Sequence, residues 1–170
     1  PTNQNTKKVD ITTTAIRLML DKAKNVDEAL ELLSSYDMHS SANSCYHFQI
    51  CGASGKSVVV EYVDNEMKVV YPDKNYQCAT NFLLTNPDAE FNFGQDRYQI
   101  IDEKLSSTNG KLSNHEAMQL LSDCSQDAHK NKQGKISKTQ WSCVYDLKNK
   151  KVTICVNENY DAKYTISVLE

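Results

Sequence analysis

The sequence predicts an α+β fold in which mainly antiparallel sheet is covered by helices. Three observations indicate this class. Apolar residues recur at helical spacing near the N-terminus, and the pattern then changes to alternating, β-branched runs. Helix signals return at Ser113, ahead of further strand-like runs. The resulting order of helix, helix, β-meander, helix, β-hairpin and strand is typical of α+β proteins.

Two helices are expected after an extended lead-in at residues 1–11. The first runs from a threonine cluster to about Lys24, and the second follows Asn25, a good N-cap residue, with Glu28 three positions later as in a capping box. Apolar residues at helical spacing define the expected buried faces, which are Ile16, Met19, Leu20 and Ala23 in the first helix and Ala29, Leu32, Leu33 and Tyr36 in the second.

A three-stranded antiparallel meander is expected next. Residues 45–51 form the first strand, and a glycine-containing turn at 52–56 leads to the β-branched second strand at 57–63. A tight turn at 64–65 returns the chain as a third strand at 67–71. We expect this meander to pack on the two helices.

The second half of the chain is less regular. Residues 78–85 are expected to form a strand and a turn, and Asp96–Leu105 the start of a helix. Ser113 and Glu116 form an S-x-x-E capping box that predicts another helix. The remaining expectations are a polar loop at 125–138, strands at 141–147 and 152–156 joined by a turn, and a last strand at 163–169. We find no linker that clearly divides the chain.

Composition excludes several classes of function. The chain has 170 residues, of which 39% are hydrophobic and 24% charged, as in a globular domain. A net charge of −3 argues against a nucleic-acid or anionic-membrane partner, and no run approaches the ~18 apolar residues of a membrane-spanning helix. Phosphate-loop, dinucleotide-binding and zinc-protease motifs are absent from the sequence, so we expect no cofactor.

The six cysteines are spread through the chain instead of forming a dense disulfide framework. We interpret them as mainly buried free thiols of a protein from a reducing, cytoplasmic compartment. Cys45, His47 and Cys51 share one strand face, but structural zinc sites use four ligands at tighter paired spacings, so core thiols and a sheet histidine are the favoured interpretation. A cysteine–histidine nucleophile pair stays open, because sequence alone does not show spatial contact.

Asn81 and Arg97 are the polar residues whose surroundings stand out. Asn81 lies among apolar or small residues in CATNFLLT, where its amide is able to donate to a developing oxyanion. The alternative is a turn or strand-end asparagine bonded to backbone groups. Arg97, in GQDRY, suits anchoring a carboxylate or orienting a catalytic group, and the alternative is an ion pair with Asp96 or another surface acid.

Five stretches in order, over residues 9–168, resemble the choloylglycine hydrolase and penicillin V acylase family. They are ITTTAIRLMLDKAKNVDEALELLSSYDMHSS, YHFQICGASGKSVVVEYVDNEMKVV, ATNFLLT, GQDRY and TQWSCVYDLKNKKVTICVNENYDAKYTISV. The family consists of linear amide C–N hydrolases of the N-terminal-nucleophile (Ntn) class. The resemblance implies an αββα sandwich, of which residues 12–170 would supply the C-terminal half. One departure is Cys51-Gly52, where relatives tend to have a small residue and Asp, and we expect it to affect the turn only.

The resemblance also implies a division of catalytic labour. The family's nucleophile is an N-terminal cysteine whose α-amino group is the base, and an Arg and an Asp shortly after it assist; all belong to the half that this sequence does not match. The chain opens with the polar stretch PTNQNTKKVD and without Met, so we expect a piece of a longer protein that is inactive alone. Asn81 corresponds to the asparagine of the oxyanion and substrate-amide environment, and Arg97 to the arginine near the nucleophile.

The expected substrate is a small-molecule amide, such as a conjugated bile salt or a phenoxyacyl penicillin. Two alternatives remain. The chain is a non-catalytic binding or structural module with the same half-fold, or it is a hydrolase that uses an internal thiol such as Cys45 or Cys143. A half-fold leaves sheet edges and an apolar face uncovered, so we also expect this chain to self-associate as a homo-oligomer.

Overall fold

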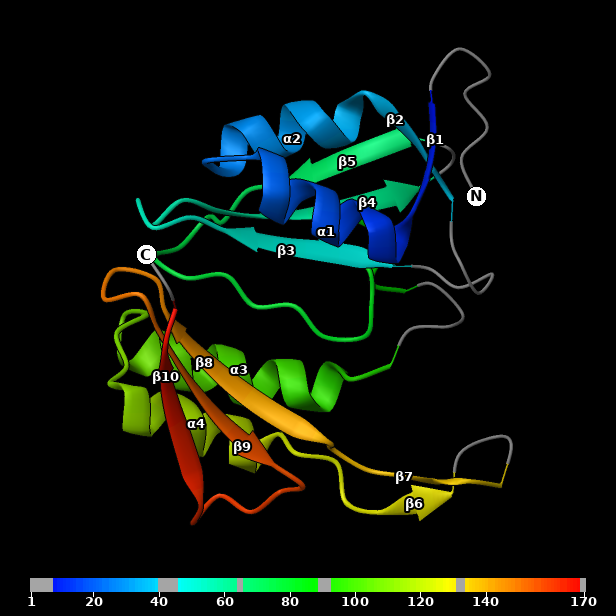
Figure 1. Cartoon of the computed structure of the whole chain (residues 1–170). Helices are drawn as coiled ribbons and strands as arrows, with labels where there is room; N and C mark the ends of the chain where they lie inside the picture. Colours follow the sequence, from blue (N-terminus) through cyan, green and yellow to red (C-terminus); the bar gives the residue numbers. More distant parts are fainter. Residues whose placement is uncertain (1–7, 40–45, 64–65, 89–92, 131–133, 169–170) are drawn as a thin grey trace. The chain divides into compact units, whose positions relative to one another are not determined.

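The computed structural model describes residues 8–39, 46–63, 66–88, 93–130 and 134–168, with the backbone alone at 8–11 and 39. Its contacts divide the chain into two compact units, Pro1–Phe93 and Gly94–Glu170. Each unit combines helices with an antiparallel sheet (Figure 1). The α+β class is therefore confirmed. The boundaries of a lead-in at 1–11 and a domain at 12–170 stay a prediction.

The first unit contains the two helices that the sequence predicts, after a short strand. Asn25 caps the second, because its side chain accepts a hydrogen bond from the backbone N–H of Glu28 over 2.9 Å. A parallel pair of short strands flanks the helices. Tyr36, expected on the helix, lies in the second of these strands. The elements are β1 (Lys8–Ile11), α1 (Thr12–Lys22), α2 (Val26–Ser34) and β2 (Tyr36–His39).

The predicted meander is confirmed as a sheet with the order β3-β4-β5. Its strands are β3 (His47–Cys51), β4 (Ser57–Val63) and β5 (Glu66–Val70). The turn between β3 and β4 is closed by a 2.9 Å hydrogen bond from the Gly52 N–H to the Lys56 carbonyl. Gly55 in this turn has φ +89°, a conformation that only glycine adopts without strain. Residues 45 and 64–65 lie outside the described part of the chain.

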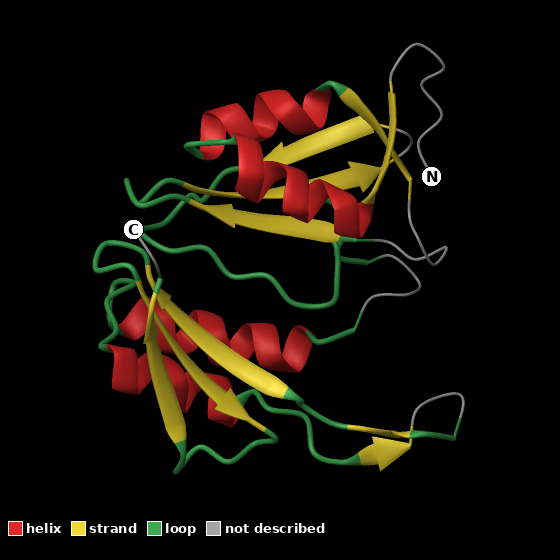
Figure 2. Cartoon of the chain, in the orientation of Figure 1, coloured by secondary structure: helices red, strands yellow, loops and turns green. Residues whose placement is uncertain are grey.

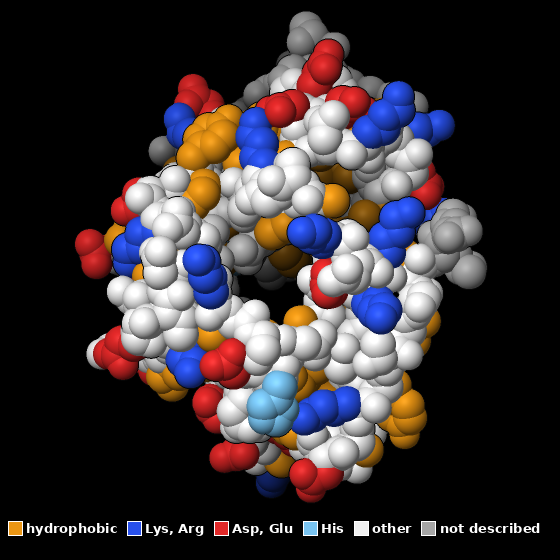
Figure 3. All heavy atoms as spheres, turned by 90° about the vertical axis from the view of Figure 1, so that its left-hand side faces the viewer, with side chains coloured by type: hydrophobic (Ala, Val, Ile, Leu, Met, Phe, Trp, Pro, Cys, Tyr) orange, Lys and Arg blue, Asp and Glu red, His pale blue; other side chains and the backbone are white. Residues whose placement is uncertain are grey.

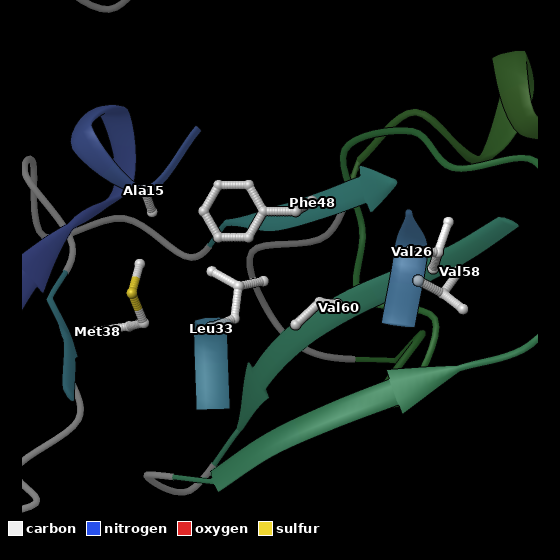
Figure 4. Close-up of a cluster of buried hydrophobic side chains, with 7 residues drawn as sticks. All are labelled: Ala15, Val26, Leu33, Met38, Phe48, Val58 and Val60. Atoms are coloured by element: carbon white, nitrogen blue, oxygen red, sulfur yellow. The ribbon is translucent and has the colours of Figure 1, made fainter. Parts of the chain in front are cut away.

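The core of the first unit lies between the helices and one face of this sheet (Figure 4). The side chains that meet there are Ala15, Val26, Leu33, Met38, Phe48, Val58 and Val60. The predicted buried face of α2 is confirmed at Ala29 and Leu33. The predicted stripe of α1 is confirmed only in part: Met19 packs against this core, whereas Ile16 and Leu20 are exposed. Ala15, which lay outside the predicted stripe, is fully buried.

The second face of the sheet is covered by the segment that follows β5 (Figure 2). Gln77 crosses it: its backbone carbonyl accepts from the Gln49 amide over 3.1 Å, and its side-chain carbonyl accepts from the Ser57 hydroxyl over 2.7 Å. Of the strand and turn predicted at 78–85, the strand is wrong and the turn is confirmed at 84–85. Residues 78–80 are irregular, 81–82 are bends, and Leu83 forms one isolated bridge with Asn86. As a result, β4 is buried on both faces.

The second unit contains a helical pair and a three-stranded antiparallel sheet with the order β10-β9-β8. The predicted helix at 96–105 and the capping box of Ser113 and Glu116 are both confirmed. A two-stranded hairpin occupies part of the predicted polar loop. The elements are α3 (Gln95–Ser107), α4 (Asn114–Asp123), β6 (His129–Lys130), β7 (Ile136–Ser137), β8 (Trp141–Asp146), β9 (Lys151–Val156) and β10 (Lys163–Ser167).

Helix α4 packs against this sheet. Met118 and Cys155 are the most buried apolar side chains here, each 1% exposed. Polar contacts fix the packing: the Asn114 amide donates to the Thr153 hydroxyl over 3.1 Å, and the Tyr160 hydroxyl donates to the Leu121 carbonyl over 3.3 Å. Among the residues that the structure describes, no helix has the length and apolar character needed to cross a bilayer.

Candidate functional site

Asn81 lies on the segment that covers the second face of the β3-β4-β5 sheet. Cys78 and Phe82, on either side of it, are buried at 7% and 8% exposure, whereas Asn81 itself is exposed. A turn follows, closed by a 3.3 Å hydrogen bond from the Asn86 N–H to the Leu83 carbonyl. The segment is therefore anchored by buried side chains while it presents Asn81 at the surface of its unit.

The strongest anchor of this segment is Glu61 in β4. Its side chain is fully buried, with 0% exposure. One carboxylate oxygen, Oε1, accepts from the Leu84 N–H over 2.6 Å, and the other, Oε2, accepts from the N–H of Thr85 over 2.9 Å and from its hydroxyl. Sequence reasoning missed Glu61. The available signal was a single carboxylate in the β-branched run SVVVEYV, where an apolar residue is expected.

Arg97 lies in the first turn of α3, in the second unit, and is half-buried. Its carbonyl accepts a hydrogen bond from the Cys124 thiol over 3.9 Å, which ties the start of α3 to the end of α4. Burial raises the pKa of Cys124, the charge of Asp123 adds to this, and that of Arg97 opposes it. Asn81 belongs to the first unit and Arg97 to the second.

The alternative cysteine and histidine sites find little support. Cys45 lies outside the described residues. His47 pairs with Glu61, with Nδ1 3.7 Å from Oε1, and the Cys51 thiol lies 3.4 Å from the Ser57 hydroxyl. In β8, burial raises the pKa of the Tyr145 hydroxyl, and the neighbouring Cys143 thiol raises this pKa further. Within the described ranges, no three His, Cys, Asp or Glu side chains cluster in a way that would hold a metal ion.

Comparison with known families decides the relationship. The family model of acyl-coenzyme A:6-aminopenicillanic acid acyl-transferase matches residues 2–161. The chain belongs to this family. The match covers nearly the whole chain, and it includes both Asn81 and Arg97. A search of curated proteins finds no match.

Solved structures show the fold of this acyl-transferase family member. A mutant of conjugated bile acid hydrolase from Clostridium perfringens superposes with a TM-score of 0.68 at 14% identity, and a second variant of the same enzyme with a TM-score of 0.70 at 14% identity. In both comparisons the match covers 97% of this chain and 64% of the hydrolase chain. The chain thus has the Ntn-hydrolase fold and spans less than two thirds of the length of these structures.

Proposed function

We propose that this chain is the C-terminal portion of a hydrolase that cleaves a linear amide C–N bond in an N-acylated small molecule. Conjugated bile salts and penicillin V-like compounds are the substrate classes to test first. The family match over residues 2–161 and the fold of conjugated bile acid hydrolase support this proposal. The observation that carries it is the position of Asn81, exposed on a segment that buried side chains hold in place.

The proposed reaction is acyl transfer to an N-terminal cysteine outside these 170 residues. The cysteine α-amino group takes the thiol proton, and the sulfur attacks the amide carbonyl carbon. The carbonyl oxygen becomes an oxyanion, and the C–N bond then breaks as the amine leaves with the proton. Water next attacks the thioester, which releases the carboxylic acid and restores the thiol.

Asn81 is proposed to donate a hydrogen bond to the carbonyl oxygen as its negative charge develops. A neutral amide suits this role, because it donates N–H without a charge that would bind the substrate before reaction. Arg97 is proposed to hold the catalytic groups in place through its guanidinium, whose planar donors match a carboxylate. Arg97 is half-buried in the first turn of α3.

The test uses the full-length protein that contains this chain, with release of the free amine from glycine-conjugated bile salts and from penicillin V as the readout. Asn81→Ala is expected to lower kcat by about 10²–10³-fold, the usual effect of removing one oxyanion donor. Asn81→Asp keeps the size but loses the NH2 group and is expected to be equally slow. Asn86→Ala, an exposed asparagine of the same segment, is the matched control. Full activity of Asn81→Ala would contradict the proposed role of Asn81, and no amine release from the unsubstituted full-length protein would contradict the proposed hydrolysis.

The non-catalytic alternative predicts a different outcome. A binding or structural module would bind the same compounds, measured by calorimetry, without releasing amine from either. The 170-residue chain alone is expected to release none, since nucleophile and base reside elsewhere. Assays with an added amine acceptor test transfer in place of hydrolysis, the activity in the family's name.

The distribution of charge on the surface also agrees with a small-molecule substrate. Acidic and basic side chains are interspersed over the face drawn in Figure 3, as expected for a chain of net charge −3 that binds neither nucleic acid nor membrane. We also propose a reducing, cytoplasmic location. The five cysteines among the described residues are free thiols, and Cys78 and Cys155 are buried.

A further inference from the structure

Glu61 is a charged side chain in the most buried strand of the first unit. Its neighbours Val58, Val59 and Val60 are, like Glu61 itself, 0% exposed. Removing a carboxylate from water costs several kcal/mol unless protein donors replace the lost hydration. A residue of this kind in the middle of a sheet therefore requires specific partners, and the identity of those partners indicates what it does.

The hydrogen-bond donors come from the turn after Asn81. Leu84 and Thr85 are successive residues of that turn, and their backbone N–H groups point to separate oxygens of the Glu61 carboxylate, at 2.6 and 2.9 Å. The Thr85 hydroxyl donates to the same oxygen as its own N–H. Hydrogen bonds to a charged acceptor are about twice as strong as neutral ones. Three such bonds fix the turn to the central strand.

We infer that Glu61 is a positioning residue that holds Asn81 in place for catalysis, an inference that rests on the proposed function. Asn81 is three residues before Leu84, and Phe82 between them is buried. A strand buried on both faces is a rigid support, whereas a segment of bends is not. Without the Glu61 carboxylate, the two N–H groups of the turn lose their acceptor, and the amide of Asn81 loses its fixed position.

The deciding experiment measures kcat and KM for the full-length protein with Glu61→Gln, Asn81→Ala and the double variant. Glu61→Gln is expected to lower kcat about tenfold or more while KM changes about twofold or less. In the Asn81→Ala background, Glu61→Gln is expected to have little further effect, because Glu61 acts on kcat only through the position of the Asn81 amide, which is then already absent. Glu66→Gln, at an exposed carboxylate of neighbouring β5, is the matched control and is expected to leave kcat unchanged.

The outcomes separate this inference from the proposed function. If the losses of kcat in the two single variants multiply in the double variant, Glu61 acts independently of Asn81. That result would assign Glu61 a merely structural role, and it would overturn this inference without affecting the proposed function. Absence of amine release from the unsubstituted full-length protein would overturn the proposed function, whereas full activity of Asn81→Ala would overturn the role of Asn81 and the positioning role of Glu61 with it. Thr85→Val removes the hydroxyl donor but keeps the backbone N–H, so it serves as the second variant if Glu61→Gln does not fold. It is expected to lower kcat about two- to fivefold, again only when Asn81 is present.

Hydrogen exchange tests the anchor without any assay of activity. Glu61→Gln keeps one acceptor oxygen and replaces the other by an NH2 group, so at least one of the amides of Leu84 and Thr85 is expected to exchange about tenfold faster or more, while those of β4 remain protected. Unchanged exchange at both amides would overturn the anchoring and with it the inference.

Discussion

His47 lies directly opposite Glu61 in the β3–β4 ladder, with its Nδ1 3.7 Å from Oε1 of the carboxylate. This distance exceeds that of a hydrogen bond, so the two groups are polar neighbours across the ladder. The His47 side chain is 20% exposed and the Glu61 side chain 0%. The imidazole is therefore a partly exposed neighbour of the fully buried carboxylate that anchors the Asn81 segment.

Replacing this histidine is expected to destabilise the first unit through Glu61. His47→Leu is expected to lower the free energy of unfolding by about 1 kcal/mol, because the buried carboxylate loses a polar neighbour. In a Glu61→Gln background, the same replacement is expected to cost measurably less. Urea unfolding of the four proteins measures this coupling. Equal losses in both backgrounds would contradict it.

The helical core of the first unit depends on Leu33. This side chain is 2% exposed between α2 and the sheet, so Leu33→Ala is expected to lower the free energy of unfolding by about 2–5 kcal/mol. Leu20 in α1 is 77% exposed, and Leu20→Ala is expected to change it by about 0.5 kcal/mol or less. Urea unfolding compares the two. A larger loss of unfolding free energy in Leu20→Ala than in Leu33→Ala would indicate that Leu20 is buried, as the sequence pattern predicted.

Leu20 also illustrates what the sequence pattern does and does not determine. Spacing and capping residues predicted the helices and most strands closely, since these signals are local. The buried face of α1 was predicted only in part, because hydropathy favours Ile16 and Leu20, which are exposed, as well as Met19, which packs against the core. The structure also buries Ala15. Which side of a helix is covered depends on the partner surface, which a single segment does not encode.

The candidate site was likewise predicted only in part from the sequence. Asn81 and Arg97 were singled out by their surroundings and assigned roles through a family resemblance, and their roles stay predictions. Glu61 was missed because its partners, Leu84 and Thr85, lie more than 20 positions along the chain. The strand predicted within 78–85 was wrong, whereas the turn predicted there is present. In that turn the N–H groups of Leu84 and Thr85 bond to the Glu61 side chain, a contact that local spacing does not predict.

Thiol labelling is expected to distinguish the exposed cysteine from buried ones. Cys51 is exposed, whereas Cys155 is 1% exposed, and burial raises the pKa of its thiol. Because the thiolate is the reactive form, Cys155 is expected to react with a disulfide reagent at neutral pH only on unfolding. In a Cys45→Ser background, Cys51→Ser is expected to remove the fastest phase. Labelling of Cys155 in the folded protein at the rate of Cys51 would contradict this.

The capping box of α4 is expected to make stability depend on acid pH. The backbone N–H of Ser113, and then its hydroxyl, donate to Glu116 and lower the pKa of that carboxyl below its usual 4.5. A lowered folded-state pKa means that the contribution is fully present above pH 4.5 and is lost as the pH falls through the folded value.

Urea unfolding at neutral and strongly acidic pH measures this contribution. Glu116→Gln is expected to be less stable than the natural protein at neutral pH, and the difference is expected to shrink in acid. In a Ser113→Ala background, which removes the hydroxyl donor, the difference at neutral pH is expected to be smaller from the start. A Glu116→Gln effect independent of pH would exclude the carboxylate as its source.

The isolated chain is expected to self-associate through one face of the β8–β10 sheet. The strand register places four large apolar side chains on this face, and each is more than half exposed: Trp141, Tyr145, Tyr164 and Ile166. Apolar surface of this extent favours association, and in a protein of the full length of the bile acid hydrolases other chain segments are available to cover it. A second copy of the chain is the expected occupant when those segments are absent.

Light scattering after size-exclusion chromatography at micromolar concentration tests this expectation. The 170-residue chain is expected to run as a dimer or larger species, and the double variant Trp141→Ser, Ile166→Ser to shift toward monomer. Ile136→Ser is the matched control, since Ile136 is 75% exposed but lies on the β6–β7 hairpin outside this sheet. A monomeric natural chain would show that the face does not drive association, and an equal shift in the Ile136 variant would assign the contact to the hairpin.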